Sequence, residues 1–287
     1  MGVSVVILNY NGAHLLPACI ESLESQDYGD LEIIVADNAS TDNSIQVAES
    51  YGAEVVRMDK NYGFGYTNNR AAEIAKGEFI FFVNNDMRFE RNCVSELVSV
   101  LQSDDRIFAA DPLQYNWDGS RIIHGCVKIG KGGIDSWFPY VRVYHDPSVS
   151  RVRNIPWGCA GSLMIRAKMF RQLGGWDETF FLDCEDVDLC IRAWMRGWPT
   201  VYVPTAKLYH MAGGSGKPPM WRVISGERNF MRFVLKTMSS QWVMRMLSAK
   251  ILQALLLSIV GRRRGRGILA AMFGVLQMLP QILAERR

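Results

Sequence analysis

The sequence predicts an α/β fold in which helices cover both faces of a mostly parallel sheet. Two observations predict this class. Continuous apolar runs rich in β-branched residues, typical of strands buried on both faces, alternate with helix-like segments over the first hundred residues. Polar residues directly follow several of these runs. Because ligands of parallel sheets bind beyond the carboxyl ends of the strands, the sequence indicates a binding site at one sheet edge.

The first 110 residues give a regular order of strands and helices. The first strand is an apolar run that breaks at Asn9-Tyr10-Asn11-Gly12, and Gly77 stops the third helix. Ser40 or Thr41 can cap the second helix. The expected strands are residues 3–8, 31–36, 54–58, 78–83 and 107–110, and the expected helices are residues 15–25, 41–51, 66–76 and 90–102.

The remaining sequence is less regular. Residues 111–165 are rich in glycine, tyrosine and tryptophan, which predicts short strands and loops. From about residue 219 onward we expect three helices, broken near Ser239 and at the arginine- and glycine-rich stretch 261–267. The elements expected between these regions are helices in the later part of 163–173 and over 186–196, and short strands at 200–203 and 207–210.

The composition is that of a globular protein, because 48% hydrophobic and 21% charged residues exclude disorder and collagen-like repeats. The formal net charge of +3 conceals an asymmetry. Residues 1–216 carry 19 basic and 27 acidic side chains, whereas residues 217–287 carry 13 basic and 2 acidic ones. A basic segment favours contact with a polyanion. Its apolar runs, 251–260 and 268–284, favour an anionic membrane surface over nucleic acid.

The six cysteines form no Cys-x-x-Cys pair, so we expect neither a zinc knuckle nor a redox motif. The chain opens directly on its first strand, without the basic region of a signal peptide. We therefore expect a cytoplasmic, reducing location.

Two segments suggest a metal site. Asn84-Asn85-Asp86 follows the apolar run 78–83. A strand that ends in a short acidic motif can present Mg²⁺ or Mn²⁺, which take hard oxygen ligands and substrate phosphates. The alternative is that Asp86 caps the next helix. His210, before a glycine-rich segment, can close over a metal–phosphate site or serve a structural role. The histidines without such a context are His14, His124 and His145.

Further polar residues follow the second and third strands. Asp37 can hydrogen-bond a base or a ribose, or belong to an ordinary strand-to-helix turn. Asn61-x-Gly63-x-Gly65 precedes a helix, where glycine permits close approach of a phosphate to the helix N-terminus. Arg70 in that helix can pair with a diphosphate, or with a surface acid.

Acidic residues crowd segment 177–188, within an otherwise aromatic and apolar stretch. Their mutual repulsion favours raised pKa values unless some are paired or functional. Asp188 and Arg192 stand four residues apart on a predicted helix, so we expect them to pair. Glu185 and Asp186 then remain at the helix start, where a carboxylate can act as a general base. The alternative is that these acids cap the helix.

The ordered set of motifs resembles family 2 glycosyltransferases, and among them the rhamnosyltransferase-like, non-processive members. The resemblance covers about residues 3–235 and implies a GT-A fold. We then expect a catalytic domain over residues 1–216 and a basic helical region over 217–287. Within the catalytic domain, residues 1–110 form the nucleotide-sugar-binding half and residues 111–216 the acceptor-binding half. The matching motifs are the first strand, Asp37-Asn38-Ala39-Ser40-Thr41-Asp42, Asn61-x-Gly63-x-Gly65, Asn84-Asn85-Asp86, Gly174-Gly175-Trp176-Asp177-Glu178, Glu185-Asp186-x-Asp188 and His210.

The resemblance also implies roles for single residues. Asp37 reads the nucleotide base, Asp86 and His210 bind a divalent Mn²⁺ or Mg²⁺ ion, and Asp186 is the general base. Asn84 replaces the first acid of the family's DXD motif, so it can hydrogen-bond the ribose but adds no charge. The other residues expected to bind the nucleotide sugar are Asn9, Asn61, Gly63, Arg70 and Asn85. Those expected to bind the acceptor or the donor sugar are Trp157, Gly161, Trp176, Asp177 and Glu185.

The implied reaction is an inverting, metal-dependent transfer of one sugar from dTDP-rhamnose or a UDP-sugar. The acceptor is a hydroxyl of a glycan or lipid-linked molecule in cell-surface polysaccharide assembly. Residues 241–246 do not fit the Gln-x-x-Arg-Trp motif of processive synthases, which favours a single addition. One alternative is a catalytically silent nucleotide-sugar-binding scaffold, which Asn84 favours. Another is a nucleic-acid binder that uses residues 261–267, which leaves the acidic cluster unexplained.

The C-terminal region favours an amphipathic helical pair in the membrane interface, with the arginines of 262–266 on anionic headgroups. Arg245 and Lys250 make a span over residues 242–260 costly. Residues 268–284 stand at the short limit for a span. The alternatives are a buried hairpin, a homo-oligomer contact or insertion as a hairpin. We expect a cytoplasmic protein associated peripherally with the inner face of the cell membrane.

Overall fold

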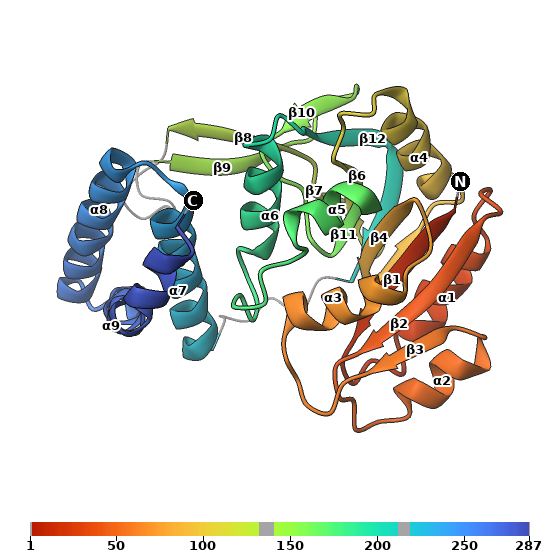
Figure 1. Ribbon diagram of the computed structural model, residues 1–287, viewed down its shortest axis with the longest axis horizontal. Helices are drawn as coiled ribbons and strands as arrows, with labels where there is room; N and C mark the ends of the chain where they lie inside the picture. The colour runs from red at the N-terminus through yellow and green to blue at the C-terminus, as the bar shows by residue number, and fades with distance from the viewer. Residues whose placement is uncertain (1, 132–140, 212–218, 287) are drawn as a thin grey trace. The chain divides into compact units, whose positions relative to one another are not determined.

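The computed structural model describes residues 2–131, 141–211 and 219–286. Its main feature is a large mixed sheet with the strand order β10-β12-β6-β11-β4-β1-β2-β3 (Figure 1). The part nearest the N-terminus is parallel. Its strands, in spatial order, are β4 (Phe79–Asn84), β1 (Val3–Asn9), β2 (Leu31–Asp37) and β3 (Glu54–Arg57). The predicted α/β class with a mostly parallel sheet is therefore confirmed for this half.

The other half of the sheet mixes directions. β11 (Ser162–Arg166) runs antiparallel to β4 and to β6 (Ala109–Asn116), and β12 (Thr200–His210) runs parallel to β6. The predicted strands 200–203 and 207–210 are one strand, whose register shifts between Val203 and Lys207. The short strands that pair with this half are β5 (Met87–Phe89), β7 (Ile122–His124) and β10 (Arg153–Ile155).

Two apolar cores explain the continuous hydrophobic runs of the strands. Val5 and Ile7 of β1 pack into one core, and Val6 between them packs into the other. Both faces of the strand are therefore buried. The first core is covered by α1 (Leu16–Glu24), α2 (Ser44–Ser50) and α4 (Cys93–Ser103). The second is covered by α3 (Phe64–Ile74), α5 (Ala167–Leu173) and α6 (Glu185–Trp194).

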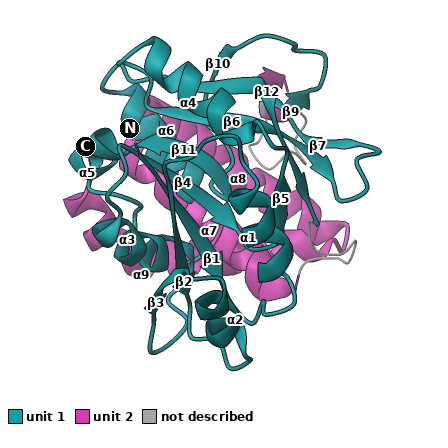
Figure 2. Ribbon diagram, turned by 90° about the vertical axis from the view of Figure 1, so that its right-hand side faces the viewer, with its two compact units in different colours: residues 1–128, 145–181, 185–213 teal, residues 129–144, 182–184, 214–287 magenta. Residues whose placement is uncertain are grey.

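The chain divides into two compact units (Figure 2). The first comprises residues 1–128, 145–181 and 185–213 and holds the sheet. The second comprises residues 129–144, 182–184 and 214–287. Strands β8 (Cys126–Lys131) and β9 (Val141–Asp146) pair with each other in a separate small sheet.

The helices of the second unit are α7 (Met220–Thr237), α8 (Ser240–Ile259) and α9 (Arg263–Ala284). The buried Glu227 carboxylate of α7 binds Lys250 of α8 at 2.6 Å and Arg264 of α9 at 2.8 Å. By length and composition, α8 and α9 could each cross a membrane. Only 39% and 28% of their most apolar windows are buried inside the protein, so most of these residues are not covered by the rest of the chain.

Candidate active site

The carboxyl ends of β4, β1 and β2 place polar side chains next to one another. Asn9 lies opposite Asp37 in the register of β1 and β2, and Leu8 lies opposite Asn84 of β4. Asn9 Nδ2 donates to Asp37 Oδ1 at 3.0 Å, and Asn85 Nδ2 donates to Asn9 Oδ1 at 2.6 Å. Asn9 and Asp37 are buried, so this network fixes the polar edge of the sheet.

Asp37 also holds the turn that follows β2. Its Oδ2 accepts the Ser40 N–H at 3.0 Å and its Oδ1 accepts the Ser40 hydroxyl at 2.6 Å. Ala39 between them has a left-handed φ of 66°. The ordinary strand-to-helix turn is therefore present, and Asp37 is 1% exposed. Recognition of a nucleotide base by Asp37 stays a prediction.

Asn61 and Gly63 order the loop before α3. Asn61 Oδ1 accepts the Asn38 Nδ2 at 2.9 Å and the Gly63 N–H at 3.0 Å. Gly63 has a φ of 84°, and a Cβ there would overlap the carbonyl oxygen of Phe181. That oxygen accepts the N–H of Phe64, the first residue of α3, at 2.8 Å. The glycine is thus required by the packing of the chain itself, and contact with a phosphate stays a prediction.

The pairing of β5 with β12 brings Asp86 and His210 together. His210 lies opposite Met87, and the Met211 N–H donates to the Asp86 carbonyl at 2.9 Å. The His210 Nε2 and Asp86 Oδ2 atoms are 3.2 Å apart, and their side chains are 18% and 23% exposed. A carboxylate oxygen and an imidazole nitrogen therefore converge at a position that solvent can reach.

This pair fits a divalent ion that takes its other ligands from elsewhere. Among the residues that the structure describes, no group of three or more histidines, cysteines, aspartates or glutamates could hold a metal. Mg²⁺ sites typically use one or two carboxylates plus substrate phosphates and waters. Asp86 and His210 would then supply two ligands, and a diphosphate would complete the shell.

Asp186 stands at the start of α6. Its Oδ1 accepts the Val187 N–H at 2.8 Å, and its side chain is partly exposed, whereas Glu185 is 6% exposed. Asp183 and Cys184 directly before the helix have left-handed φ values of 71° and 77°. Such angles are rare for non-glycine residues and are held by surrounding structure, so the start of α6 is closely fixed.

The predicted pair of Asp188 and Arg192 is confirmed. The Arg192 Nε donates to Asp188 Oδ2 at 2.7 Å, and both side chains are buried. The guanidinium group also donates to the carbonyls of Leu173 and Gly175. This pair therefore anchors α6 to the segment after α5.

A buried acid–histidine pair between β6 and β7 was not expected from the sequence. Asp111 in β6 is 0% exposed, and its Oδ2 lies 2.7 Å from His124 Nε2 in β7. Its Oδ1 accepts the Cys159 N–H at 3.0 Å. Burial opposes the charged imidazole, but the Asp111 carboxylate outweighs that effect and raises the pKa of His124, with a further contribution from Asp186. The expected strand 107–110 overlaps the start of β6, but Asp111 and Pro112 hid its extension to Asn116, because neither residue is typical of a strand.

The structure uses two predicted binding residues for its own packing. Arg70 pairs with Glu178 and with Glu73, each at 3.0 Å, so the alternative of pairing with acids is the one observed. Trp176 is 1% exposed and packs edge-on against Phe64 and other rings of the second core. Arg70 and Trp176 thus have structural partners, and ligand binding by either residue stays a prediction.

The remaining predicted residues lie in different surroundings. The Gly161 carbonyl accepts the Asn84 N–H at 2.9 Å, and a Cβ at Gly161 would contact the Asn84 amide at 2.5 Å. Asp177 Oδ1 accepts the N–H and hydroxyl of Thr179 at 3.0 and 2.6 Å. Trp157 is half-buried against the second core. Gly161 thus adjoins the polar sheet edge, whereas Asp177 closes a local turn.

Comparison with known proteins identifies a family that the chain matches. The model of the family described as glycosyl transferase family 2 matches residues 4–174. A similar relative is the N-acetylglucosaminyl-diphospho-decaprenol L-rhamnosyltransferase of Mycobacterium tuberculosis. It is 26% identical over 262 residues, which cover 83% of this chain and 85% of the relative. Rhamnosyltransferase WbbL of Escherichia coli is 26% identical over 230 residues, covering 73% and 83%.

Solved structures share the fold at low sequence identity. GalNAc-T7 with UDP, GalNAc and Mn²⁺ has a TM-score of 0.66 at 17% identity, covering 84% of this chain and 48% of its own. TarS 1-349 of S. aureus with UDP-GlcNAc has a TM-score of 0.63 at 16% identity, covering 99% and 84%. A mannosyltransferase of Pyrobaculum calidifontis with GDP-Man and Mn²⁺ has a TM-score of 0.62 at 16% identity, covering 97% and 75%.

Proposed function

The chain belongs to glycosyl transferase family 2, and from this we propose that it moves one sugar from a nucleotide diphosphate sugar to an acceptor hydroxyl, inverting the anomeric configuration. One observation carries the proposal. Asp86 and His210 meet at 3.2 Å through the pairing of β5 with β12. Asn84 and Asn85, directly before Asp86, belong to the polar edge that contains Asp37.

The donor is held at this edge. Asp37, in the network of Asn9 and Ser40, faces the nucleoside, and the Asn84 and Asn85 amides provide hydrogen-bonding groups without charge. Asp86 and His210 would hold Mn²⁺ or Mg²⁺. When bound, the ion would supply positive charge against the negative charge of the departing diphosphate.

Asp186 acts on the acceptor. Its carboxylate takes the proton of the attacking hydroxyl while that oxygen bonds to the anomeric carbon. The bond between that carbon and the diphosphate oxygen breaks on the opposite face, and this direct displacement inverts the configuration. Asp186 suits the role because it is partly exposed at the start of α6, whereas Glu185 is buried and Asp188 is paired.

The relatives suggest the substrates. Two of them are named as rhamnosyltransferases, and one of these names specifies a sugar linked through a diphosphate to a polyprenol. We therefore propose dTDP-rhamnose as the first donor to test and a lipid-linked sugar diphosphate as the acceptor. This places the reaction in the assembly of cell-surface polysaccharide, on the cytoplasmic face of the membrane.

The exposed helices of the second unit support that location. Ile259, Phe273 and Leu276 are 80%, 64% and 65% exposed, and residues 217–287 carry 13 basic and only 2 acidic side chains. Apolar side chains next to basic ones are typical of helices that lie in the interface of an anionic membrane. We propose that α8 and α9 contact the membrane in this way.

A donor panel tests the function. The full chain is incubated with dTDP-rhamnose and with UDP- and GDP-sugars, with Mn²⁺ or with EDTA, and products are identified by mass spectrometry. We expect transfer or slow hydrolysis of one donor, at a rate that EDTA reduces strongly. Donor binding without turnover would instead support the silent scaffold, for which Asn84 in place of an acid is the supporting feature.

A further inference from the structure

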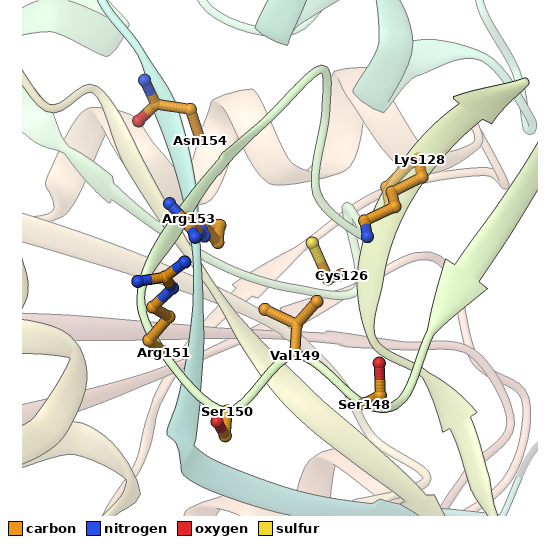
Figure 3. Close-up of a pocket in the computed structure, with 9 residues that line it drawn as sticks. Cys126, Lys128, Ser148, Val149, Ser150, Arg151, Arg153 and Asn154 are labelled. Carbon is orange, nitrogen blue, oxygen red and sulfur yellow. The ribbon is translucent and has the colours of Figure 1, made fainter.

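A basic pocket lies at the edge of the first unit, away from the polar edge of the sheet. It has a volume of about 340 Å³ and is formed by the start of β8, the segment before β10 and β10 itself. Figure 3 shows Arg151 and Arg153 on one side of the pocket and Lys128 on the other. The other residues around it are Cys126, Val127, Ser148, Val149, Ser150 and Asn154.

Two of the three cations in this pocket form no ion pair with the residues that the structure describes. Lys128 Nζ binds Asp146 Oδ2 at 2.6 Å. The same carboxylate accepts the Ser148 N–H and hydroxyl, and Lys128 and Ser148 together lower the pKa of Asp146 to about 2. Within the described part of the chain, neither Arg151 nor Arg153 forms an ion pair. Counting the described residues alone, the pocket therefore presents the positive charges of Arg151 and Arg153 without an ion-pair partner.

The pocket is too far from the donor edge to bind the nucleotide diphosphate. β10 pairs with β12 at Thr200–Tyr202, at the opposite end of that strand from His210. Tyr202, opposite Arg153, precedes His210 by eight residues, so at about 3.3 Å per residue the two ends lie roughly 26 Å apart along β12. A diphosphate bound between Asp86 and His210 cannot span that distance.

The pocket instead adjoins the buried pair near Asp186. Cys126 at the pocket follows His124 by two residues, and the Gly125 carbonyl accepts from His145 Nδ1 at 3.3 Å. His124 in turn contacts Asp111, and the charge of Asp186 reaches this imidazole. In addition, Trp194 Nε1 of α6 donates to the Ile155 carbonyl of β10 at 3.0 Å. The pocket is thus linked by direct contacts to α6, whose first turn holds Asp186, the base of the proposed transfer.

We infer that the Arg151–Arg153 pocket binds the diphosphate group of the acceptor. The inference rests on the proposed function, because it assigns a site to part of that acceptor. Guanidinium groups are suited to it, since each presents several N–H donors in a planar fork that matches phosphate oxygens. A diphosphate also carries enough negative charge to neutralise both arginines.

A pair of acceptors tests the inference. One is a sugar diphosphate with a short prenyl chain, and the other is an alkyl glycoside of the same sugar without phosphate. For Arg151→Gln/Arg153→Gln, we expect the ratio of kcat/KM for the diphosphate acceptor to that for the glycoside to fall at least tenfold. Arg91→Gln/Arg106→Gln removes two exposed arginines elsewhere and should leave the ratio unchanged. An equal loss on both acceptors in the pocket variant would overturn the inference.

Direct binding separates this inference from the proposed function. Inorganic pyrophosphate is titrated calorimetrically into the protein in EDTA, which removes the ion that the donor edge needs to hold a diphosphate. We expect at least tenfold weaker binding in the pocket variant, even if no acceptor is glycosylated and the proposed function fails. Equal pyrophosphate affinity would overturn the inference. It would also be overturned if the variant lost flotation with phosphatidylglycerol vesicles but kept its acceptor ratio, because the pocket would then bind lipid headgroups.

Discussion

Asp186 is the side chain on which the proposed transfer depends most directly. Replacement by asparagine keeps the size of the side chain but removes the proton acceptor. General-base catalysis contributes about 10²–10⁴-fold in rate, so we expect Asp186→Asn to lower kcat by that order. Donor affinity and the melting temperature should change little. The exposed Asp118→Asn is the control, and near-wild-type turnover of Asp186→Asn would exclude Asp186 as the base.

His210 is expected to act through the metal. The pair that it forms with Asp86 is 3.2 Å apart and partly exposed, so loss of the imidazole removes one ligand without opening a core cavity. For His210→Gln we expect at least a tenfold higher Mn²⁺ concentration for half-maximal rate. Electron paramagnetic resonance of Mn²⁺ with nucleotide diphosphate should show the same loss. His14→Gln removes an exposed histidine as a control, and an unchanged Mn²⁺ affinity in His210→Gln would reject the ligand role.

His124 makes stability depend on pH. The Asp111 carboxylate overcomes the effect of burial and raises the pKa of His124 above the value of about 6.5 in an unfolded chain. Its proton therefore stabilises the fold below about pH 6.5, and that contribution is lost as the pH rises through the folded-state pKa. Burial and the charge of His124 lower the pKa of His145, which gives the opposite slope.

The measurement isolates His124 in a His145→Asn background. We expect the free energy of unfolding in urea to fall as the pH rises above about 6.5 in this variant, and to fall less when His124→Asn is added. Identical slopes in the two proteins would show that His124 is not preferentially protonated in the fold.

The loop before α3 is constrained both by its backbone conformation and by its packing against Phe181. Gly63 and Gly52 both have left-handed φ values, 84° and 72°, but only at Gly63 does a Cβ meet other atoms. Gly52→Ala should cost about 1–2 kcal/mol for the backbone alone. Gly63→Ala should cost roughly 3 kcal/mol, because overlap with Phe181 adds to the strain. Urea unfolding measures both, and equal costs would contradict the packing shown here.

The apolar faces of α8 and α9 give a prediction for the membrane. Phe273 and Leu276 of α9 are 64% and 65% exposed. Transfer of a large apolar side chain out of water contributes about 1.5–3 kcal/mol, so Phe273→Gln/Leu276→Gln should weaken vesicle binding at least tenfold. Flotation with phosphatidylglycerol vesicles measures this. Met195→Gln, exposed in the first unit, is the control. Equal flotation of the double variant and the wild type would remove α9 from the membrane contact.

At the level of the whole molecule, the sequence predicted the parallel half well because its signals are local. Successive residues of β1 pack alternately into the two cores. Both faces of the strand therefore need apolar residues, and the resulting unbroken apolar run is visible in the sequence. The mixed half carries weaker signals. Asp111 and Pro112 break the strand-like sequence pattern of β6, and residues 204–206 break that of β12, so those strands depend on neighbours distant in the chain.

In the candidate site, too, some residues could be predicted from local sequence and others could not. The Asn84-Asn85-Asp86 motif follows its strand directly and could be identified from residue order alone. Arg70 and Trp176 could not be placed, because an arginine pairs with whichever acid the fold brings near it, and a tryptophan beside glycines gives no sign of its burial. The Asp111–His124 pair depends on the antiparallel pairing of β6 with β7, and no local sequence pattern predicts that pairing.

The pairing of β5 with β12 has a consequence for biosynthesis. β12 is the last strand of the large sheet to leave the ribosome, yet it supplies His210 and inserts between β6 and β10. A nascent chain arrested before residue 210 therefore has Asp86 without its imidazole neighbour and a sheet with a missing member. The divalent-ion site proposed for Asp86 and His210 is therefore complete only after residue 210 has been synthesised.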